Sequence, residues 1–121
     1  MSKPYRILYV DDEEELRFLV KNQLSSEGFE VDTADDGDTA LAMAGGKEYD
    51  VILLDIRMPR MNGLEVLKNL KQQKIATRVI MLTGVDDLGV ALEAVKSGAI
   101  DYLTKPYELT ELMRAIMRVV A

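Results

Sequence analysis

The sequence contains no cysteine, no histidine and no tryptophan among its 121 residues. Without cysteine the chain forms no disulfide and has no thiolate nucleophile, although this says nothing more about its compartment. Without histidine it lacks the commonest general base, the usual zinc ligand and any phosphohistidine of its own. These absences exclude thiol chemistry and histidine-based catalysis or metal binding.

Long apolar runs are also missing, since no stretch approaches the ~20 residues that a helix needs to cross a bilayer. The first residues, Met1 to Pro4, form no apolar signal region, so we expect the chain to stay in the cytoplasm. The formal net charge is −6, which argues against binding of nucleic acid through a basic surface. Any role linked to DNA would therefore need another domain.

The composition, with 48% apolar and 30% charged residues, is typical of a soluble globular protein. A chain of this length forms one hydrophobic core but not two, so we expect a single domain over residues 1–121.

Short apolar runs alternate along the chain with segments of helical periodicity. Strands are expected at residues 6–10, 29–34, 51–55, 78–83 and 99–104. A helix follows each expected strand; the second opens at Asp36-Gly37 and the third spans 63–71. Each helix carries an apolar stripe. In chain order the stripes are Leu16, Leu19, Val20 and Leu24; Ala40, Leu41 and Ala44; Leu64, Leu67 and Leu70; Leu88, Ala91, Leu92 and Val95; and Leu109, Leu112, Met113, Ile116 and Val120. Helix ends are expected at Gly28, Gly45-Gly46 and Gly98. This pattern predicts an α/β fold with an open, doubly wound, five-stranded parallel sheet.

The most informative segment is Val51–Leu54, a uniformly apolar run that ends in Asp55. Such a run is typical of a central strand buried on both faces, so Asp55 is expected where the strand surfaces. Pro59 and Gly63 then predict a rigid loop that leaves the carboxylate accessible.

Polar side chains follow the other strands at the same edge of the predicted sheet: Asp11 and Asp12 after the first, Thr83 after the fourth and Lys105 after the fifth. Because ligands bind such sheets beyond the carboxyl ends of the strands, we expect these groups to meet Asp55 at one rim. Three crowded carboxylates repel one another, and a hard divalent cation such as Mg²⁺ would relieve the repulsion. Such a cation would also attract phosphate oxygens, and Thr83 and Lys105 would supply a hydroxyl and an ammonium, the further groups needed around a phosphoryl group.

Five short motifs, in register on successive strand–helix units, give the chain a strong resemblance to the receiver domain of two-component response regulators. The motifs are Val10-Asp11-Asp12-Glu13 with Leu16-Arg17, Ala34-Asp35-Asp36-Gly37 with Ala40-Leu41, Asp50 to Asp55 with Met58-Pro59 and Gly63, Met81-Leu82-Thr83-Gly84, and Gly98-Ala99 with Asp101 to Pro106. The resemblance covers essentially the whole chain. It implies the flavodoxin-like (βα)5 fold with strand order 2-1-3-4-5.

The same resemblance implies roles for the residues at the rim. Asp55 would be the phosphoacceptor, Asp12 a direct Mg²⁺ ligand, and Asp11 its water-linked or electrostatic partner. The backbone carbonyl of Arg57 would complete the protein ligands, and Lys105 would contact the phosphoryl group.

Two further roles follow from the resemblance. Thr83 and Tyr102 correspond to the switch pair of the family, and Lys105 precedes Pro106, whose peptide bond in receivers is typically cis. The chain would then be a phosphorylation-activated switch and no conventional enzyme. A sensor histidine kinase or a histidine phosphotransfer protein would supply the phosphoryl group. The face made by the fourth helix, fifth strand and fifth helix would control an output domain, a partner or a phosphorylation-dependent homodimer.

Simpler interpretations stand beside these. Asp55 could be an ordinary turn residue at a strand end. Thr83 could cap the next helix, although Asp86 or Asp87 would do so more naturally. Tyr102 could be a partly buried packing residue.

Two other protein classes share this fold. A flavin- or nucleotide-binding domain would have a glycine-rich phosphate loop, whereas the first loop here is Asp-Asp-Glu-Glu-Glu. A phosphohydrolase with an aspartyl nucleophile generally has a second acid two residues later, where this chain has Arg57. A receiver that never takes phosphate is a third alternative, and the sequence leaves open whether the chain stands alone or belongs to a longer protein.

Overall fold

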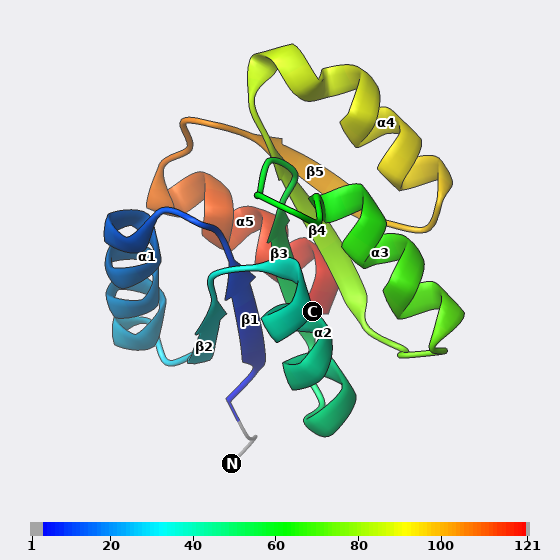
Figure 1. Cartoon of the computed structure of the whole chain (residues 1–121). Coiled ribbons are helices and arrows are strands. Elements are labelled where there is room, and N and C mark those ends of the chain that lie inside the picture. The colour runs from blue at the N-terminus through cyan, green and yellow to red at the C-terminus, as the bar shows by residue number, and fades with distance from the viewer. Residues whose placement is uncertain (1–3, 121) are drawn as a thin grey trace.

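The computed structural model describes residues 4–120, so residues 1–3 and 121 of the predicted domain lie outside it. The elements along the chain are β1 (Arg6–Val10), α1 (Glu14–Ser26), β2 (Glu30–Ala34), α2 (Gly37–Gly46), β3 (Val51–Asp55), α3 (Gly63–Gln72), β4 (Arg78–Thr83), the 3₁₀ turn η1 (Val85–Asp87), α4 (Leu88–Lys96), β5 (Asp101–Thr104) and α5 (Leu109–Val120). The strands form one parallel sheet in the order β2-β1-β3-β4-β5, which confirms the predicted fold (Figure 1).

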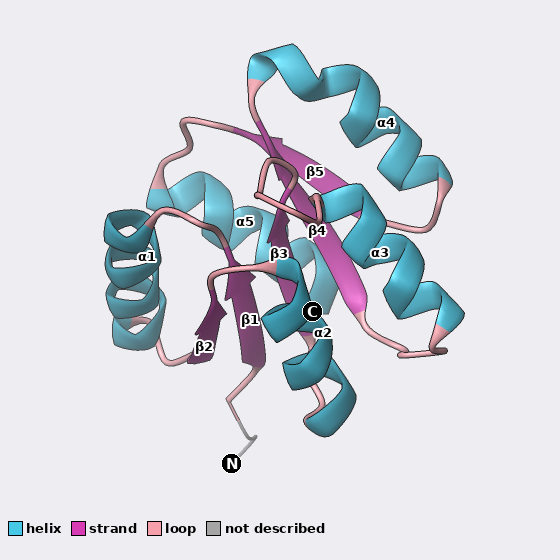
Figure 2. Ribbon diagram, in the orientation of Figure 1, coloured by secondary structure: helices cyan, strands magenta, loops and turns pink. Residues whose placement is uncertain are grey.

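The sheet separates the hydrophobic core into two layers. Helices α1 and α5 cover one face, and α2, α3 and α4 cover the other (Figure 2). The central strand β3 is buried at all five of its residues, which is what a uniformly apolar strand between two helical layers requires. Asp55 is the last residue of that strand, so the fold brings its carboxylate to the carboxyl-end rim of the sheet.

Gly63, the first residue of α3, shows how tightly the loop after β3 folds back. Its N–H donates to the carbonyl oxygen of Ile56 at 2.8 Å. A Cβ atom at this position would meet the backbone oxygen of Asp55 and would lie 2.9 Å from the Cα of Ile56. Only glycine fits here without moving the backbone that carries Asp55.

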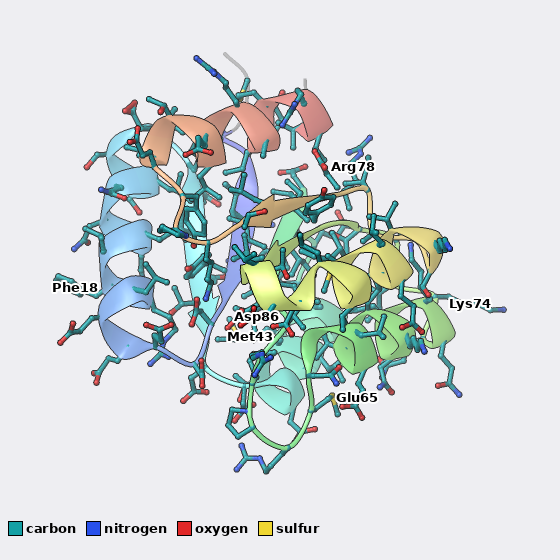
Figure 3. All side chains as sticks on the ribbon, turned by 90° about the horizontal axis from the view of Figure 1, so that it is seen from above. Phe18, Met43, Glu65, Lys74, Arg78 and Asp86 are labelled. Atoms are coloured by element: carbon teal, nitrogen blue, oxygen red, sulfur yellow. The ribbon has the colours of Figure 1, made fainter. Side chains whose placement is uncertain are left out.

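The helix stripes predicted from the sequence are only partly buried. On α1, Val20 and Leu24 face the core, but Leu19 is exposed, as is Phe18, which points away from the sheet (Figure 3). On α3, Val66 is buried where Leu64 was expected, and Leu64 is only half-buried.

The largest error concerns α4. Of the expected stripe of Leu88, Ala91, Leu92 and Val95, only Ala91 is buried, together with Ala94, and the three larger side chains are exposed. Helix α4 packs on the sheet beside β4 and β5, the latter an edge strand, so the sheet covers only a narrow strip of it.

Several boundaries also differ from the predicted ones. Gly28 and Gly98 follow helix ends with φ of +94° and +116°, as expected of glycine after a helix. Gly45 and Gly46 are the last residues of α2, where the end of this helix was expected. Strand β2 begins at residue 30, one later than expected, and β5 at 101, because the N–H of Ala99 still bonds to the α4 carbonyl of Ala94. No helix within residues 4–120 combines the length and apolar character needed to span a membrane.

Candidate functional site

The structure brings three carboxylates together at the carboxyl-end rim. One oxygen each from Asp11, Asp12 and Asp55 lies within 4.8 Å of the others. Asp11 directly follows β1 and Asp55 ends β3, and these strands are neighbours in the sheet. Asp11 and Asp55 are buried, whereas Asp12 is exposed and faces the solvent side of the cluster.

The turn after β1 orients Asp11 inward. Its Oδ1 accepts the backbone N–H of Glu13 at 2.9 Å, a local bond typical of aspartate in turns. Arg17, on the first turns of α1, donates from Nη1 to the carbonyl oxygen of Asp11 at 2.7 Å. The next residue in the turn, Asp12, brings its carboxylate to the same cluster.

Lys105 places its ammonium among the carboxylates. Its Nζ donates to Asp11 Oδ2 at 2.8 Å and lies 3.3 Å from Asp55 Oδ1. The backbone N–H of Lys105 donates to the carbonyl oxygen of Thr83 at 2.7 Å, which ties the loop after β5 to the end of β4. The peptide bond between Lys105 and Pro106 is cis.

The electrostatics of the cluster are dominated by burial. The pKa of Asp55 is raised from 3.8 to about 7: burial is the largest cause, the negative charge of Asp11 adds to it, and Lys105 offsets part of the rise. Burial by itself lowers the pKa of Lys105, but its hydrogen bond to Asp11 and the charge of Asp55 raise it overall. One ammonium therefore does not neutralise three carboxylates.

Thr83 and Tyr102 lie near this site without touching its carboxylates. Thr83 is buried and its hydroxyl donates to the carbonyl oxygen of Gly84 at 2.9 Å rather than to Asp55. Tyr102 is exposed and pairs in register with Met81, two residues before Thr83 on β4. Both side chains would have to move in order to act as a switch pair.

Arg57 takes part in an ion pair that the sequence did not indicate. Its Nε and Nη2 donate to Asp87 Oδ2 at 2.6 Å and Oδ1 at 3.0 Å, linking the loop after β3 to η1. The pair raises the pKa of Arg57 and lowers that of Asp87. Asp87 occupies the N-cap position of α4, but its side chain makes no cap bond to that helix.

A pocket of about 350 Å³ opens beside the cluster. It is lined by Asp12, Glu13, Asp55, Arg57, Gly84, Asp86, Asp87 and Lys105. A larger hollow of about 880 Å³ lies at the other end of the sheet, where the strands begin, around residues 4–6, 47–50 and 75–78. There the side chain of Asp50 accepts the N–H of Arg6 at 2.7 Å, and its cations and acids are mixed rather than crowded by sign. The smaller pocket is therefore the candidate site.

Two tyrosines belong to the site and were missed in the sequence. Tyr9, fully buried in β1, donates from its hydroxyl to Asp11 Oδ2 at 3.1 Å, and its oxygen lies 2.6 Å from the hydroxyl oxygen of Tyr107. Residues two apart on a strand share a face, and a buried tyrosine hydroxyl needs a polar partner. That spacing was a usable signal for Tyr9, whereas nothing in the sequence connects Tyr107 to it.

The donor set suits a hard cation. The cluster offers carboxylate oxygens alone, which Mg²⁺ prefers, and the exposed side of Asp12 leaves room for the waters that Mg²⁺ retains. Three carboxylates gather around the single ammonium of Lys105, and this excess of negative charge is a further reason that a divalent cation fits these residues.

The sequence profile of the response regulator receiver domain matches residues 7–117. The chain belongs to this family. It is 39% identical over 118 residues to the regulatory protein AtoC of Escherichia coli and 40% identical over 116 residues to the alkaline phosphatase synthesis transcriptional regulatory protein PhoP of Bacillus subtilis. These alignments cover 98% and 93% of this receiver chain, but only 26% and 48% of the relatives.

The fold of the receiver chain also matches solved structures. The chemotaxis protein CheY4 of Vibrio cholerae superposes with a TM-score of 0.89 at 36% identity, covering 96% of this chain and 98% of that one. Membership of the family makes this chain a signalling domain of two-component systems rather than a classical enzyme.

Proposed function

We propose that the chain is a single receiver domain, residues 1–121, that accepts a phosphoryl group on Asp55 and thereby switches its surface. The donor would be the phosphohistidine of a sensor histidine kinase or of a histidine phosphotransfer protein. The observation that supports this best is the buried Asp55 carboxylate, which lies beside two further acids and the ammonium of Lys105.

The proposed step is a transfer between two side chains. The bond between phosphorus and the histidine nitrogen breaks, a bond between phosphorus and an Asp55 carboxylate oxygen forms, and the histidine nitrogen regains a proton from solvent. Asp55 must be ionised to attack. Lys105 is close enough to turn from the carboxylates to an oxygen of the incoming group.

Mg²⁺ bound at this rim would supply positive charge that keeps the carboxylates ionised and attracts phosphoryl oxygens. Asp11, Asp12, Asp55 and the backbone carbonyl of Arg57 are the groups proposed to hold it. The chain itself contributes the orientation, since the strand ends and the Asp11 turn place these oxygens before any ligand arrives.

The output would travel through Thr83 and Tyr102. A phosphoryl group adds about −1.5 to −2 charge and strong acceptors, so the Thr83 hydroxyl would exchange the Gly84 carbonyl for a phosphoryl oxygen. The space left by that movement would admit Tyr102, which is exposed in this structure. The result would be a shift of population between two packings.

The face that would change is made by α4, β5 and α5. Large apolar side chains are exposed on all three elements and on the residue before β5, which suits a partner, an output domain or a second copy of the chain: Leu88, Leu92, Val95, Ile100, Tyr102 and Met117. Relatives such as AtoC and PhoP are regulatory proteins of which the alignments cover only 26% and 48%, which supports an output domain as one target. We place this activity in the cytoplasm, where kinase domains present their phosphohistidine.

Acetyl phosphate with Mg²⁺ tests the acceptor. Intact-protein mass spectrometry should show one added phosphoryl group that hydroxylamine removes, as an acyl phosphate requires. Asp55→Asn should gain none, while Asp35→Asn, which changes an exposed acid outside the cluster, should behave as the wild type. Phosphoserine or phosphothreonine in the product would contradict the proposal.

Beryllofluoride, a stable mimic of the phosphoryl group, tests the output. In the wild type it should shift the NMR signals of amides on α4, β5 and α5. Thr83→Ala should bind beryllofluoride at Asp55 without those distant shifts, and the control Thr39→Ala, on the exposed side of α2, should keep them. Complete shifts in Thr83→Ala would rule out this route.

A further inference from the structure

We infer that Tyr9 and Tyr107 form a directed chain of hydroxyl groups that positions the carboxylate of Asp11 for cation binding. The inference rests on the proposed function, since it concerns the same rim. It adds two positioning residues that lie beneath the carboxylates and do not line the pocket.

The direction of the chain follows from counting protons. An ionised carboxylate only accepts hydrogen bonds, so Tyr9 must give its single hydroxyl proton to Asp11 Oδ2 at 3.1 Å. The 2.6 Å contact between the two hydroxyl oxygens is then made by the proton of Tyr107. Tyr107 therefore donates to Tyr9 and Tyr9 donates to Asp11, so Tyr107 reaches the carboxylate only through Tyr9.

The chain is the rigid part of the Asp11 environment. Lys105 also donates to Asp11 Oδ2, but its ammonium sits on a flexible stem and is shared with Asp55 at 3.3 Å and with Glu13 at 3.9 Å. Tyr9 has no exposed surface and belongs to a strand paired on both sides. When Lys105 turns toward a phosphoryl group, the Tyr9 hydroxyl keeps Asp11 in place.

Tyr107 connects this carboxylate to a distant part of the chain. It follows Pro106 and lies two residues before α5, packed against the same core layer as Tyr9. The hydroxyl chain therefore ties the end of β1 to the loop that leads into α5. Residues that orient a metal ligand in this way typically change metal affinity 10- to 100-fold when they are removed.

Isothermal titration of Mg²⁺ into the wild type, Tyr9→Phe, Tyr107→Phe and the double variant tests the inference. Tyr9→Phe should bind Mg²⁺ about 10-fold more weakly. Tyr107→Phe should lose less, because the bond from Tyr9 to Asp11 remains. The double variant should bind no more weakly than Tyr9→Phe, since Tyr107 acts only through Tyr9.

Tyr49→Phe is the matched control. Tyr49 is also buried and donates to a single carboxylate, Asp32 Oδ2, at 2.7 Å, outside the acidic cluster. Its loss should lower the melting temperature about as much as the loss of the Tyr9 hydroxyl, while leaving the Mg²⁺ affinity unchanged. Affinity thus separates positioning from general stability.

Equal Mg²⁺ affinities in the wild type and Tyr9→Phe would overturn the inference alone, and so would losses that add in the double variant. Absence of Mg²⁺ binding by the wild type would overturn the proposed function as well. If Tyr9→Phe does not fold, the half-buried Tyr107 still decides the question, because an unchanged affinity in Tyr107→Phe contradicts the chain.

Discussion

Two carboxylates in this molecule each accept hydrogen bonds from one lysine and one tyrosine, but their surroundings differ. Asp32 Oδ2 accepts from Lys47 at 2.9 Å and from Tyr49 at 2.7 Å. Asp11 Oδ2 accepts from Lys105 at 2.8 Å and from Tyr9 at 3.1 Å.

The difference lies in the number of acids and in the burial. Asp32 is partly exposed, and its pKa is lowered first by the hydrogen bond from Tyr49 and then by the hydrogen bond and charge of Lys47. At the rim, one lysine and one tyrosine lie beside a cluster of three acids, two of them buried, and burial is the main cause that raises the pKa of Asp55 to about 7. One lysine and one tyrosine stabilise a single carboxylate, whereas the same donors leave a cluster short of positive charge. That shortage is why we propose the rim as a cation site.

The largest expected effect is on the pH dependence of stability in the absence of metal. Asp55 has a folded pKa above its ordinary value of 3.8, so its contribution to stability is complete below that value and is lost as the pH rises through about 7. Asp55→Asn should therefore stabilise the fold at pH 8 by roughly 2 to 4 kcal/mol, measured by urea denaturation.

Asp32→Asn gives the opposite sign. Its pKa is lowered on folding, so its contribution is present above its ordinary pKa and is lost as the pH falls. This variant should lose stability at pH 8 and little in acid. Destabilisation of both variants at pH 8 would break the contrast between the two carboxylates.

The next effect concerns metal-dependent stability. Mg²⁺ at 100 times its dissociation constant should stabilise the wild type by about 2.7 kcal/mol because it binds the folded state. Asp12→Ala should lose most of that increment, yet be no less stable than the wild type without metal, because a like charge has been removed from the cluster. Asp32→Ala should keep the full increment in the same thermal scans. An undiminished increment in Asp12→Ala would mean that this residue is no ligand.

The smallest expected effects compare the two lysines. Lys105→Met removes the ammonium next to two buried acids and should cost about 2 kcal/mol at pH 8 without metal. Lys47→Met removes a cation from an exposed pair and should cost at most ~0.5 kcal/mol. Denaturant midpoints measure both, and equal losses would show that the crowding of acids at the rim has no energetic consequence.

The apolar stripe of α4 shows where periodicity stops being informative. Leu88, Leu92 and Val95 repeat at helical spacing in the same way as the buried positions of α5. Periodicity predicts that a helix has an apolar face, but not how much surface is available to cover it. In α5 that face packs on the sheet, whereas in α4 only Ala91 and Ala94 are covered.

The chain of Tyr107, Tyr9 and Asp11 shows the same limit for the site. The carboxylates were predictable because each follows a strand, and parallel strands bring their carboxyl ends to one rim. Tyr9 and Tyr107 are 98 residues apart, and their contact depends on how the loop after β5 packs over β1. No local pattern encodes such a meeting.

By itself the sequence determined the order of elements, the parallel sheet and the rim on which Asp11, Asp12 and Asp55 gather. It could do so because buried strands require uninterrupted apolar residues, and the polar residue that ends each strand is visible in the chain. Only the tertiary structure decided the individual bonds at this rim: the one from Lys105 to Asp11, the ion pair of Arg57 with Asp87, and the hydroxyl chain that ends at Asp11. The physical reason is that hydrogen bonds and charge interactions act over a few ångströms between side chains whose separation the packing of distant segments alone sets.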